Sequence, residues 1–429
     1  MIVAFEHHEI ASLPRNDGTR ALWNICVCVQ SNKVFQLARQ LKKLIRLVLP
    51  AKMRNKKPHA LDYSWYDTCQ SNPISKESEM NTNTCMKNVM VMALAMSMVC
   101  SLTGVSAAAD FQAGAAMRVI TPDPLLPVSG GVGKPTPTTE ALGDLTVRAL
   151  VLARGETRVA LVSVDNLGWP AVWGDKTRAL VPGIPPENIL IGATHTHSAP
   201  DAYCFPIDGK GNHGADLDYL NWVCERMADA INEAVESLRP AALRIAVGEA
   251  KGKIAYNYYA PQLYDPRCGV LQAVSVENGK AAGVIATLVN YAIHPEVLGS
   301  DLGILSPDLC GPLYDRIEAE AGGVALFFNG AQGGMVTADN RRPDDRDLQT
   351  WDECIRIGEL LADEALRIIA EAPLQETPAL HCAAREITLP VASPLMKMIL
   401  AKSPMAGQMQ GEEGLKTTLN VVTVGTAQM

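Results

Sequence analysis

Apolar runs as long as β-strands alternate along this chain with segments of helical period, and this alternation is what most limits the folds open to it. Pairs of apolar runs separated by short turns predict two β-hairpins, one over 146–165 and one over 270–289, the second with an Asn-Gly turn. Helical spacing predicts helices at 170–181, 217–238, 308–320 and 349–371. The interleaving predicts an α/β fold, with a mixed sheet, helices on its faces and a site at the C-terminal ends of strands.

Three histidines follow two of the predicted strands. His195 and His197 come directly after the apolar run 189–192, and His294 ends the run that begins at Val284. The whole chain has only eight histidines. A His-x-His pair alone is often structural or simply exposed, but a second histidine at another strand end favours a metal site, with zinc as the expected ion.

The first part of the chain differs from the rest. Residues 1–85 hold 12 Lys and Arg against 7 Asp and Glu and show no sustained period. Residues 86–109 then have a basic start, an apolar stretch and a small-residue end, which is the form of a secretory signal peptide. We therefore predict that 1–85 is a non-native N-terminal extension and that 86–109 is a signal peptide.

The remaining residues, 110–429, carry 25 basic against 39 acidic side chains, a net charge of −14. Such a charge argues against nucleic acid and anionic membrane surfaces as partners. We expect a secreted or periplasmic α/β domain with no stable membrane span after removal of the signal. A strand predicted at 417–425 ends four residues before the chain does, so we expect this domain to be incomplete at its C-terminus. The segment 390–416 is predicted to be a loop or a mobile lid.

In this order along the chain, several segments resemble the amino-terminal catalytic domain of the neutral/alkaline non-lysosomal ceramidase family. The Thr-His-Thr-His-Ser box at 194–198 is similar to the family's first histidine box, and Asn-Tyr-Ala-Ile-His-Pro at 290–295 is similar to its second histidine strand. Ser306-Pro-Asp308-Leu-Cys-Gly311 resembles the Ser-x-Asp-x-x-Gly stretch that follows. The resemblance extends over most of 111–340.

The resemblance implies a zinc amidase and assigns roles by position. His195 and His294 would be the zinc ligands, and His197 would act beside the metal as a hydrogen-bonding or acid/base group. The ion would activate water and polarise a carbonyl. Asp308 would orient a ligand imidazole; an acidic residue at the start of the 308–320 helix is an equally good interpretation of it.

Two departures from the family pattern stand out. The family's further metal ligands, a Glu and a Tyr, fall beyond the strand that resembles 417–425. The loop 333–339 lacks the family's functional Ser; Thr337 is its nearest hydroxyl and is the candidate in that role, with a turn or cap residue as the alternative.

These observations predict an exported zinc-dependent hydrolase of amide bonds that acts on a small-molecule or lipid substrate, including an N-acyl sphingolipid. Two alternatives remain open. One is a non-catalytic exported binding protein on the same fold, and the other is a different metal-dependent hydrolase.

Overall fold

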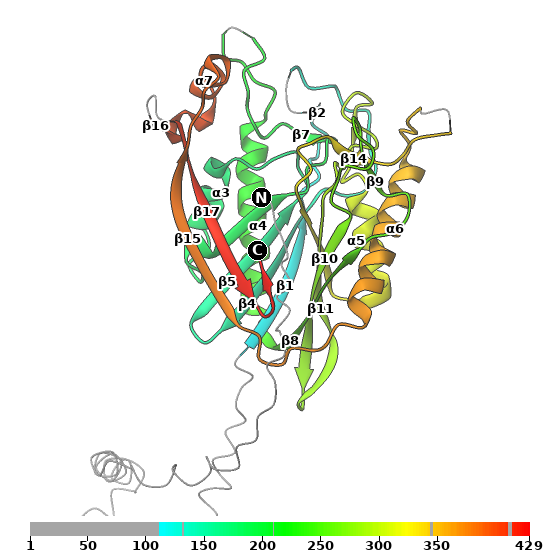
Figure 1. Ribbon diagram of the computed structural model, residues 1–429. Coiled ribbons are helices and arrows are strands. Elements are labelled where there is room, and N and C mark those ends of the chain that lie inside the picture. Colours follow the sequence, from blue (N-terminus) through cyan, green and yellow to red (C-terminus); the bar gives the residue numbers. More distant parts are fainter. Residues whose placement is uncertain (1–110, 131–132, 209, 344–345, 411–413) are drawn as a thin grey trace, which may run out of the picture. The chain divides into compact units, whose positions relative to one another are not determined.

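The computed structural model describes residues 111–130, 133–208, 210–343, 346–410 and 414–429, which belong to one compact unit. The predicted extension (1–85) and signal peptide (86–109) lie outside the described residues. Eight strands form a mixed sheet (Figure 1). In sheet order they are β13 (Val324–Asn329), β11 (Lys280–Tyr291), β10 (Arg267–Glu277), β8 (Arg239–Glu249), β1 (Phe111–Val119), β4 (Thr146–Arg154), β5 (Thr157–Val164) and β6 (Ile189–Ala193).

This sheet folds into two halves of four strands that pack face to face. Strands β1 and β8 join the halves through only two residue pairs, at Gln112 and Ala113. The edge strand β13 of one half lies against β4, β5 and β6 of the other. The predicted mixed sheet with helices on its faces is confirmed, and its folding means that helices cover only the outer face of each half.

Alternation along the strands explains the layers, because successive side chains of a strand point to opposite faces. In β4, Leu150 and Leu152 point into the core between the two halves, whereas Val147, Ala149 and Val151 point outward to the helices. In β13, Leu326 and Phe328 enter the central core, and Phe327 faces the helices on its own side. Both faces of these strands are therefore buried.

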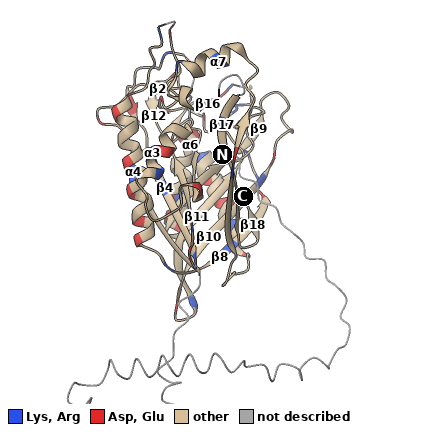
Figure 2. Cartoon of the chain, turned by 90° about the vertical axis from the view of Figure 1, so that its left-hand side faces the viewer, with Lys and Arg blue, Asp and Glu red and all other residues tan. Residues whose placement is uncertain are grey.

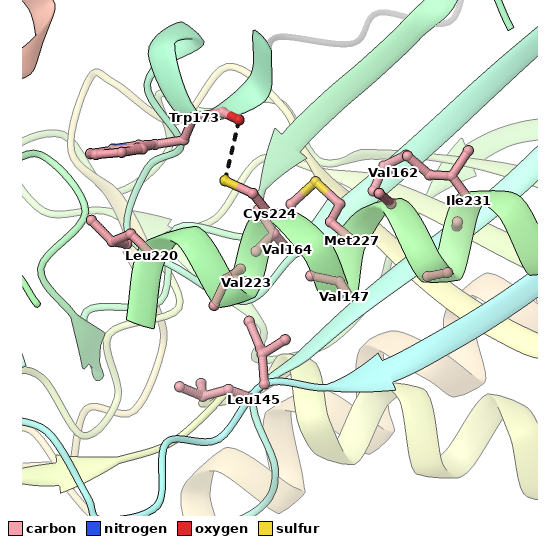
Figure 3. Close-up of a cluster of buried hydrophobic side chains, with 14 of the residues drawn as sticks. Leu145, Val147, Val162, Val164, Trp173, Leu220, Val223, Cys224, Met227 and Ile231 are labelled. Atoms are coloured by element: carbon pink, nitrogen blue, oxygen red, sulfur yellow. Dashed lines mark hydrogen bonds between the residues drawn. The ribbon is translucent and has the colours of Figure 1, made fainter. Parts of the chain in front are cut away.

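Helices α3 (Ala171–Ala179) and α4 (Leu217–Glu236) cover the first half, and α5 (Cys310–Ala321) and α6 (Trp351–Ala370) cover the second. Helix α4 starts where the Asp216 carboxylate accepts a hydrogen bond from the N–H of Tyr219. Its apolar stripe of Leu220, Val223, Met227 and Ile231 packs on the sheet (Figure 3). All four helices predicted from periodicity are present, with ends shifted by a few residues.

The two hairpins are also present, as β4–β5 and β10–β11. Their turns use Gly155, Asn278 and Gly279, all at positive φ. Asn and Gly tolerate the left-handed region that such tight turns require.

A second, smaller sheet packs against the half of the main sheet that contains β4 and β5. Strands β15 (Leu380–Leu389) and β17 (Gly414–Val424) form a hairpin extended by β16 (Met409–Gln410) and β18 (Ala427–Gln428). Val422 and Val424 join the central core at one end of this hairpin. The predicted loop at 390–416 is wrong in part, because residues 394–401 form helix α7 (Pro394–Ala401), which Ser393 caps, followed by the 3₁₀ helix η3 (Pro404–Gln408).

The remaining strands are short and pair near the ends of the long ones. They are β2 (Val128–Ser129) with β7 (Ala199–Pro200), β3 (Glu140–Ala141) with β12 (Ile304–Leu305), and β9 (Ala255–Asn257) with β14 (Val336–Ala338); η2 (Pro186–Asn188) precedes β6. In Figure 1, β2, β7, β9 and β14 gather at the top of the described unit. In Figure 2, acidic side chains recur along α4.

Candidate metal centre

Two parallel strand pairs, one in each half of the sheet, end at the site. Strand β6 runs parallel to β5 and is followed by His195 and His197, and β11 runs parallel to β13 and is followed by His294. The ring centroids are 4.9 Å apart for His195 and His294, 5.0 Å for His195 and His197, and 5.7 Å for His197 and His294. The three histidines expected to meet from distant parts of the chain do so.

Backbone carbonyls fix two of the rings. Nδ1 of His195 lies 2.6 Å from the carbonyl oxygen of Leu167, and Nδ1 of His294 lies 2.8 Å from that of Val336. A carbonyl oxygen only accepts, so each Nδ1 carries the proton and donates it. The lone pair of each ring is thereby left on Nε2, which is the tautomer that a metal-binding histidine needs.

The third ring has a different neighbour. Nδ1 of His197 lies 3.7 Å from a carboxylate oxygen of Glu296, and its Nε2 is buried without a hydrogen-bond partner. A buried nitrogen without a partner is costly in a folded protein unless something else binds it. His197 thus offers an unused lone pair inside the cluster.

Burial keeps these imidazoles neutral. Desolvation lowers the pKa of His195 from 6.5 to about 4, against a smaller opposing effect of the Leu167 carbonyl. Desolvation, with a further contribution from His294, lowers the pKa of His197 from 6.5 to about 4. Both rings are therefore unprotonated at neutral pH, as metal ligands must be.

A buried amide holds the two histidine segments together. Nδ2 of Asn329, the last residue of β13, donates to the carbonyl of Thr194 at 2.8 Å and to that of Ile293 at 2.7 Å. These are the residues directly before His195 and His294. The N–H of His197 also donates to the carbonyl of Pro295, at 3.1 Å. The spacing of the three rings is therefore set by backbone links rather than by the rings alone.

The donor set fits a single divalent ion. One ligand nitrogen from each histidine can be chosen so that all three lie within 4.8 Å of one another. Two nitrogens bound to one tetrahedral zinc lie ~3.4 Å apart, so the rings would have to close by up to about 1.4 Å to bind one ion. Three neutral imidazoles are a usual ligand set of catalytic zinc sites and leave a fourth position open.

His195 has a φ of 74°, in the left-handed region that β-carbon-bearing residues rarely adopt. Its N–H donates to the carbonyl of Asn166 at 2.9 Å, which holds this conformation in place. Unfavourable backbone conformations of this kind cluster at functional sites.

Asp308 does not bind an imidazole here. Its carboxylate accepts hydrogen bonds from the N–H groups of Leu298, at 2.9 Å, and Leu309, at 2.8 Å. The orienting role expected for it is taken by the carbonyls of Leu167 and Val336. Complete burial raises the pKa of Asp308 from 3.8 to about 6. The hydrogen bonds of Asp308 fix the segment that follows His294 to the start of α5. This arrangement is close to the alternative interpretation of Asp308 as an acidic residue at the start of a helix.

Thr337 lies beside the site through its backbone. It forms a parallel bridge with His294, next to Val336, whose carbonyl also receives the N–H of His294 at 2.9 Å. The structure assigns its half-buried hydroxyl no bond, and its catalytic role stays a prediction.

Two residues of this site were not singled out by the sequence as functional: Glu296 and, as the link between segments, Asn329. The signal for Glu296 was available, because an acid two residues after a candidate metal ligand is a candidate partner for a neighbouring imidazole. No local signal indicates the link made by Asn329, since it depends on how β13 lies between the two histidine segments.

A cavity of about 640 Å³ lies between α3, β6 and β17. The residues that line it include Trp169, Arg178, Ile191, Lys416 and Asn420, but none of the three histidines. The cavity and the candidate metal centre are therefore different places on the molecule, and the chemistry of the histidines, not the cavity volume, identifies the site.

The layered fold and the histidine cluster at the strand ends define an α/β fold with a potential metal centre. No protein-family model and no curated protein matches the chain. Among solved structures, it is similar to neutral ceramidase from Pseudomonas aeruginosa, with a TM-score of 0.56 and 17% identity over 73% of this chain and 61% of that one. It is also similar to a ceramidase complexed with C2, with a TM-score of 0.57 and 17% identity over 73% of this chain and 62% of that one.

The chain thus spans less than two thirds of the ceramidase structures that it matches. At this identity the likeness shows the fold, and it confirms the resemblance expected from the histidine boxes at that level.

Proposed function

We propose that this protein is a zinc-dependent hydrolase of amide bonds, acting on an N-acyl lipid of the ceramide type. The meeting of His195, His197 and His294 carries the proposal, because these three imidazoles share one small volume at the end of a ceramidase-type fold. The likeness to ceramidases supports the substrate class. The signal-like segment at 86–109 supports export.

We assign all three histidines to the ion, so His197 is a ligand rather than only an acid/base group. When bound, zinc would supply a Lewis acid that lowers the pKa of water and polarises a carbonyl. The carbonyls of Leu167 and Val336 hold two rings with Nε2 turned to the ion. Glu296 would draw the Nδ1 proton of His197 toward itself and thereby fix the third ring.

The experiment is a metal and activity assay on the purified full chain. We expect about one zinc per chain and hydrolysis of a fluorescent N-acyl sphingosine, with both lost in His195→Ala and His294→Ala. His381→Ala is the matched control, because His381 is exposed on β15 outside the cluster. A chain that binds no zinc would disprove the proposal. Zinc binding without turnover would instead support the non-catalytic binding protein.

A further inference from the structure

Four large exposed apolar side chains gather beside the candidate metal centre. Tyr258 is 58% exposed, Tyr259 77%, Leu263 73% and Met335 40%. We call these four residues the Tyr258 patch. Single exposed apolar residues are ordinary on protein surfaces, but a connected group of them marks an interaction surface.

Hydrogen bonds connect the members of the patch. The N–H of Tyr258 donates to the carbonyl of Met335 at 2.9 Å. The rings of Tyr258 and Tyr259 pack edge to face with centroids 5.2 Å apart. Strand β9, which leads into the two tyrosines, pairs with β14, which follows Met335. The four side chains therefore come from two segments that are held side by side.

One buried amide fixes the conformation that exposes them. Nδ2 of Asn257 donates to the carbonyls of Leu263, at 3.0 Å, and Gly334, at 2.8 Å. Its Oδ1 accepts from the N–H groups of Tyr259 and Ala260, both at 3.0 Å. The buried side chain of Asn257 uses all of its donors and acceptors to hold this loop. The exposure of the patch is therefore part of the folded structure.

The patch adjoins the histidine cluster through the backbone. Met335 directly precedes Val336, whose carbonyl binds both the N–H and the Nδ1 of His294. One end of the patch is therefore a single residue along the chain from the carbonyl that holds the His294 ring. In Figure 1, β9 and β14 lie at the end of the described unit where β7, just after His197, also lies.

The charges nearby argue for an uncharged partner. Among the basic residues that flank β9 and β14, Lys253 and Arg341 both pair with Asp339, at 3.7 and 2.9 Å. Residues 110–429 carry a net charge of −14. An anionic surface would be repelled overall, whereas zwitterionic lipid would not be. In the described part of the chain, no helix is both long and apolar enough to cross a membrane.

We infer that the Tyr258 patch is the surface by which this protein docks on a zwitterionic lipid bilayer, by insertion of its tyrosine, leucine and methionine side chains at the headgroup level. Tyrosine suits this depth because its ring is apolar and its hydroxyl stays hydrated. The docking holds the histidine cluster against the lipid surface. The delivery of a lipid amide to the cluster rests on the proposed function, but the docking itself does not.

The test is flotation of the full chain with phosphatidylcholine vesicles. We expect the wild type to bind, with little change between 0.1 and 1 M salt. The triple variant Tyr258→Ser, Tyr259→Ser, Leu263→Ser should bind the vesicles at least about tenfold more weakly than the wild type, because it removes most of the apolar area of the patch. Leu180→Ser with Leu419→Ser is the matched control, since both leucines are exposed on other elements, and it should bind as the wild type does.

Several results would overturn the inference: no binding by the wild type, equal binding by the triple variant, or binding that high salt abolishes. If the patch instead bound a second copy of the chain, the wild type would be a dimer in solution and the triple variant would be a monomer. Zinc content separates the two proposals, because the triple variant should keep its zinc. His195→Ala should lose zinc and still float with the vesicles.

Discussion

At the scale of single residues, the candidate site depends on which atom faces each imidazole. His195 and His294 donate to carbonyls, whereas His197 faces the carboxylate of Glu296. A carboxylate strengthens a ligand imidazole more than a neutral carbonyl does, because it stabilises the proton on the far nitrogen. Glu296 is therefore the residue that distinguishes the His197 ring from the other two rings.

Glu296→Gln should weaken zinc binding by roughly 10- to 100-fold without unfolding the chain, because the carboxylate behind His197 is lost. Competition with a chromophoric chelator measures the dissociation constant directly. Glu376→Gln, at an exposed position, should leave it unchanged. An unchanged affinity in Glu296→Gln would show that His197 does not rely on this carboxylate.

Asn329→Ala should lower the free energy of unfolding by about 2–4 kcal/mol, because it removes three hydrogen bonds of a buried side chain, two donated to carbonyls and one accepted from the N–H of Ile293. It should also weaken zinc binding, since the two histidine segments lose their common link. Urea denaturation of the zinc-free protein and metal titration measure the two effects. Asn188→Ala is the control, because it removes one half-buried hydrogen bond on another element. It should lower the free energy of unfolding by less than Asn329→Ala does and leave the metal affinity unchanged.

The lowered pKa values of His195 and His197 should make the zinc-free protein less stable on acidification below pH 6.5. The pKa values of His195 and His197 are about 4 in the folded state against 6.5, so the unfolded chain takes up protons first and is favoured. Asp308 opposes this, because its raised pKa of about 6 means that the folded state takes up its proton earlier than the unfolded one.

The slope of stability against pH also depends on Asp165 and Asp201, because burial raises the pKa of each carboxyl and so opposes the histidines as Asp308 does. Urea denaturation in the presence of a chelator measures this slope. His195→Gln removes one of the two histidines with a lowered pKa, so its stability should fall less on acidification than that of the wild type. An identical pH dependence in the wild type and in His195→Gln would contradict the assignment.

At the scale of elements, helices pack so closely on strands that some glycines have no room for a side chain. A β-carbon on Gly114 of β1 would lie 2.1 Å from the carbonyl oxygen of Ala234 at the end of α4. The helix can approach the strand this closely only because that side chain is absent.

Gly114→Ala should therefore destabilise the protein by about 1–3 kcal/mol, since α4 or β1 must shift. Gly283→Ala is the matched control, because its added carbon would have no atom nearer than 3.9 Å among those around it. Urea denaturation of both variants measures the difference. Equal stabilities would show that the helix adjusts freely.

At the scale of the whole molecule, the site joins the two halves of the sheet. His195 and His197 follow a strand of one half and His294 follows a strand of the other. An ion held by all three would therefore link the halves and stabilise the folded state as a whole.

Zinc at about 100 times its dissociation constant should raise the free energy of unfolding by ~2.7 kcal/mol, and a chelator should remove this gain. Thermal unfolding with and without zinc measures the effect. His381→Ala should show the same shift, whereas His294→Ala should show none. A zinc-dependent shift that persists without His294 would place the ion elsewhere.

By itself the sequence determined the local structure and the chemistry of the candidate residues. Period and turn residues predicted both hairpins and the four helices, because hydrogen bonding within an element and alternation of its side chains are local properties. It also placed His195, His197 and His294 at strand ends. Helix α7 was missed because its short apolar segment lies among turn-forming residues.

Only the tertiary structure decided which strand ends meet. The folding of one sheet into two packed halves brings the end of β6 to the end of β11, about a hundred residues later, and places Asn329 between them. It also turned Asp308 toward backbone N–H groups and Glu296 toward His197. Such contacts depend on how distant elements pack, and no local pattern of residues specifies that.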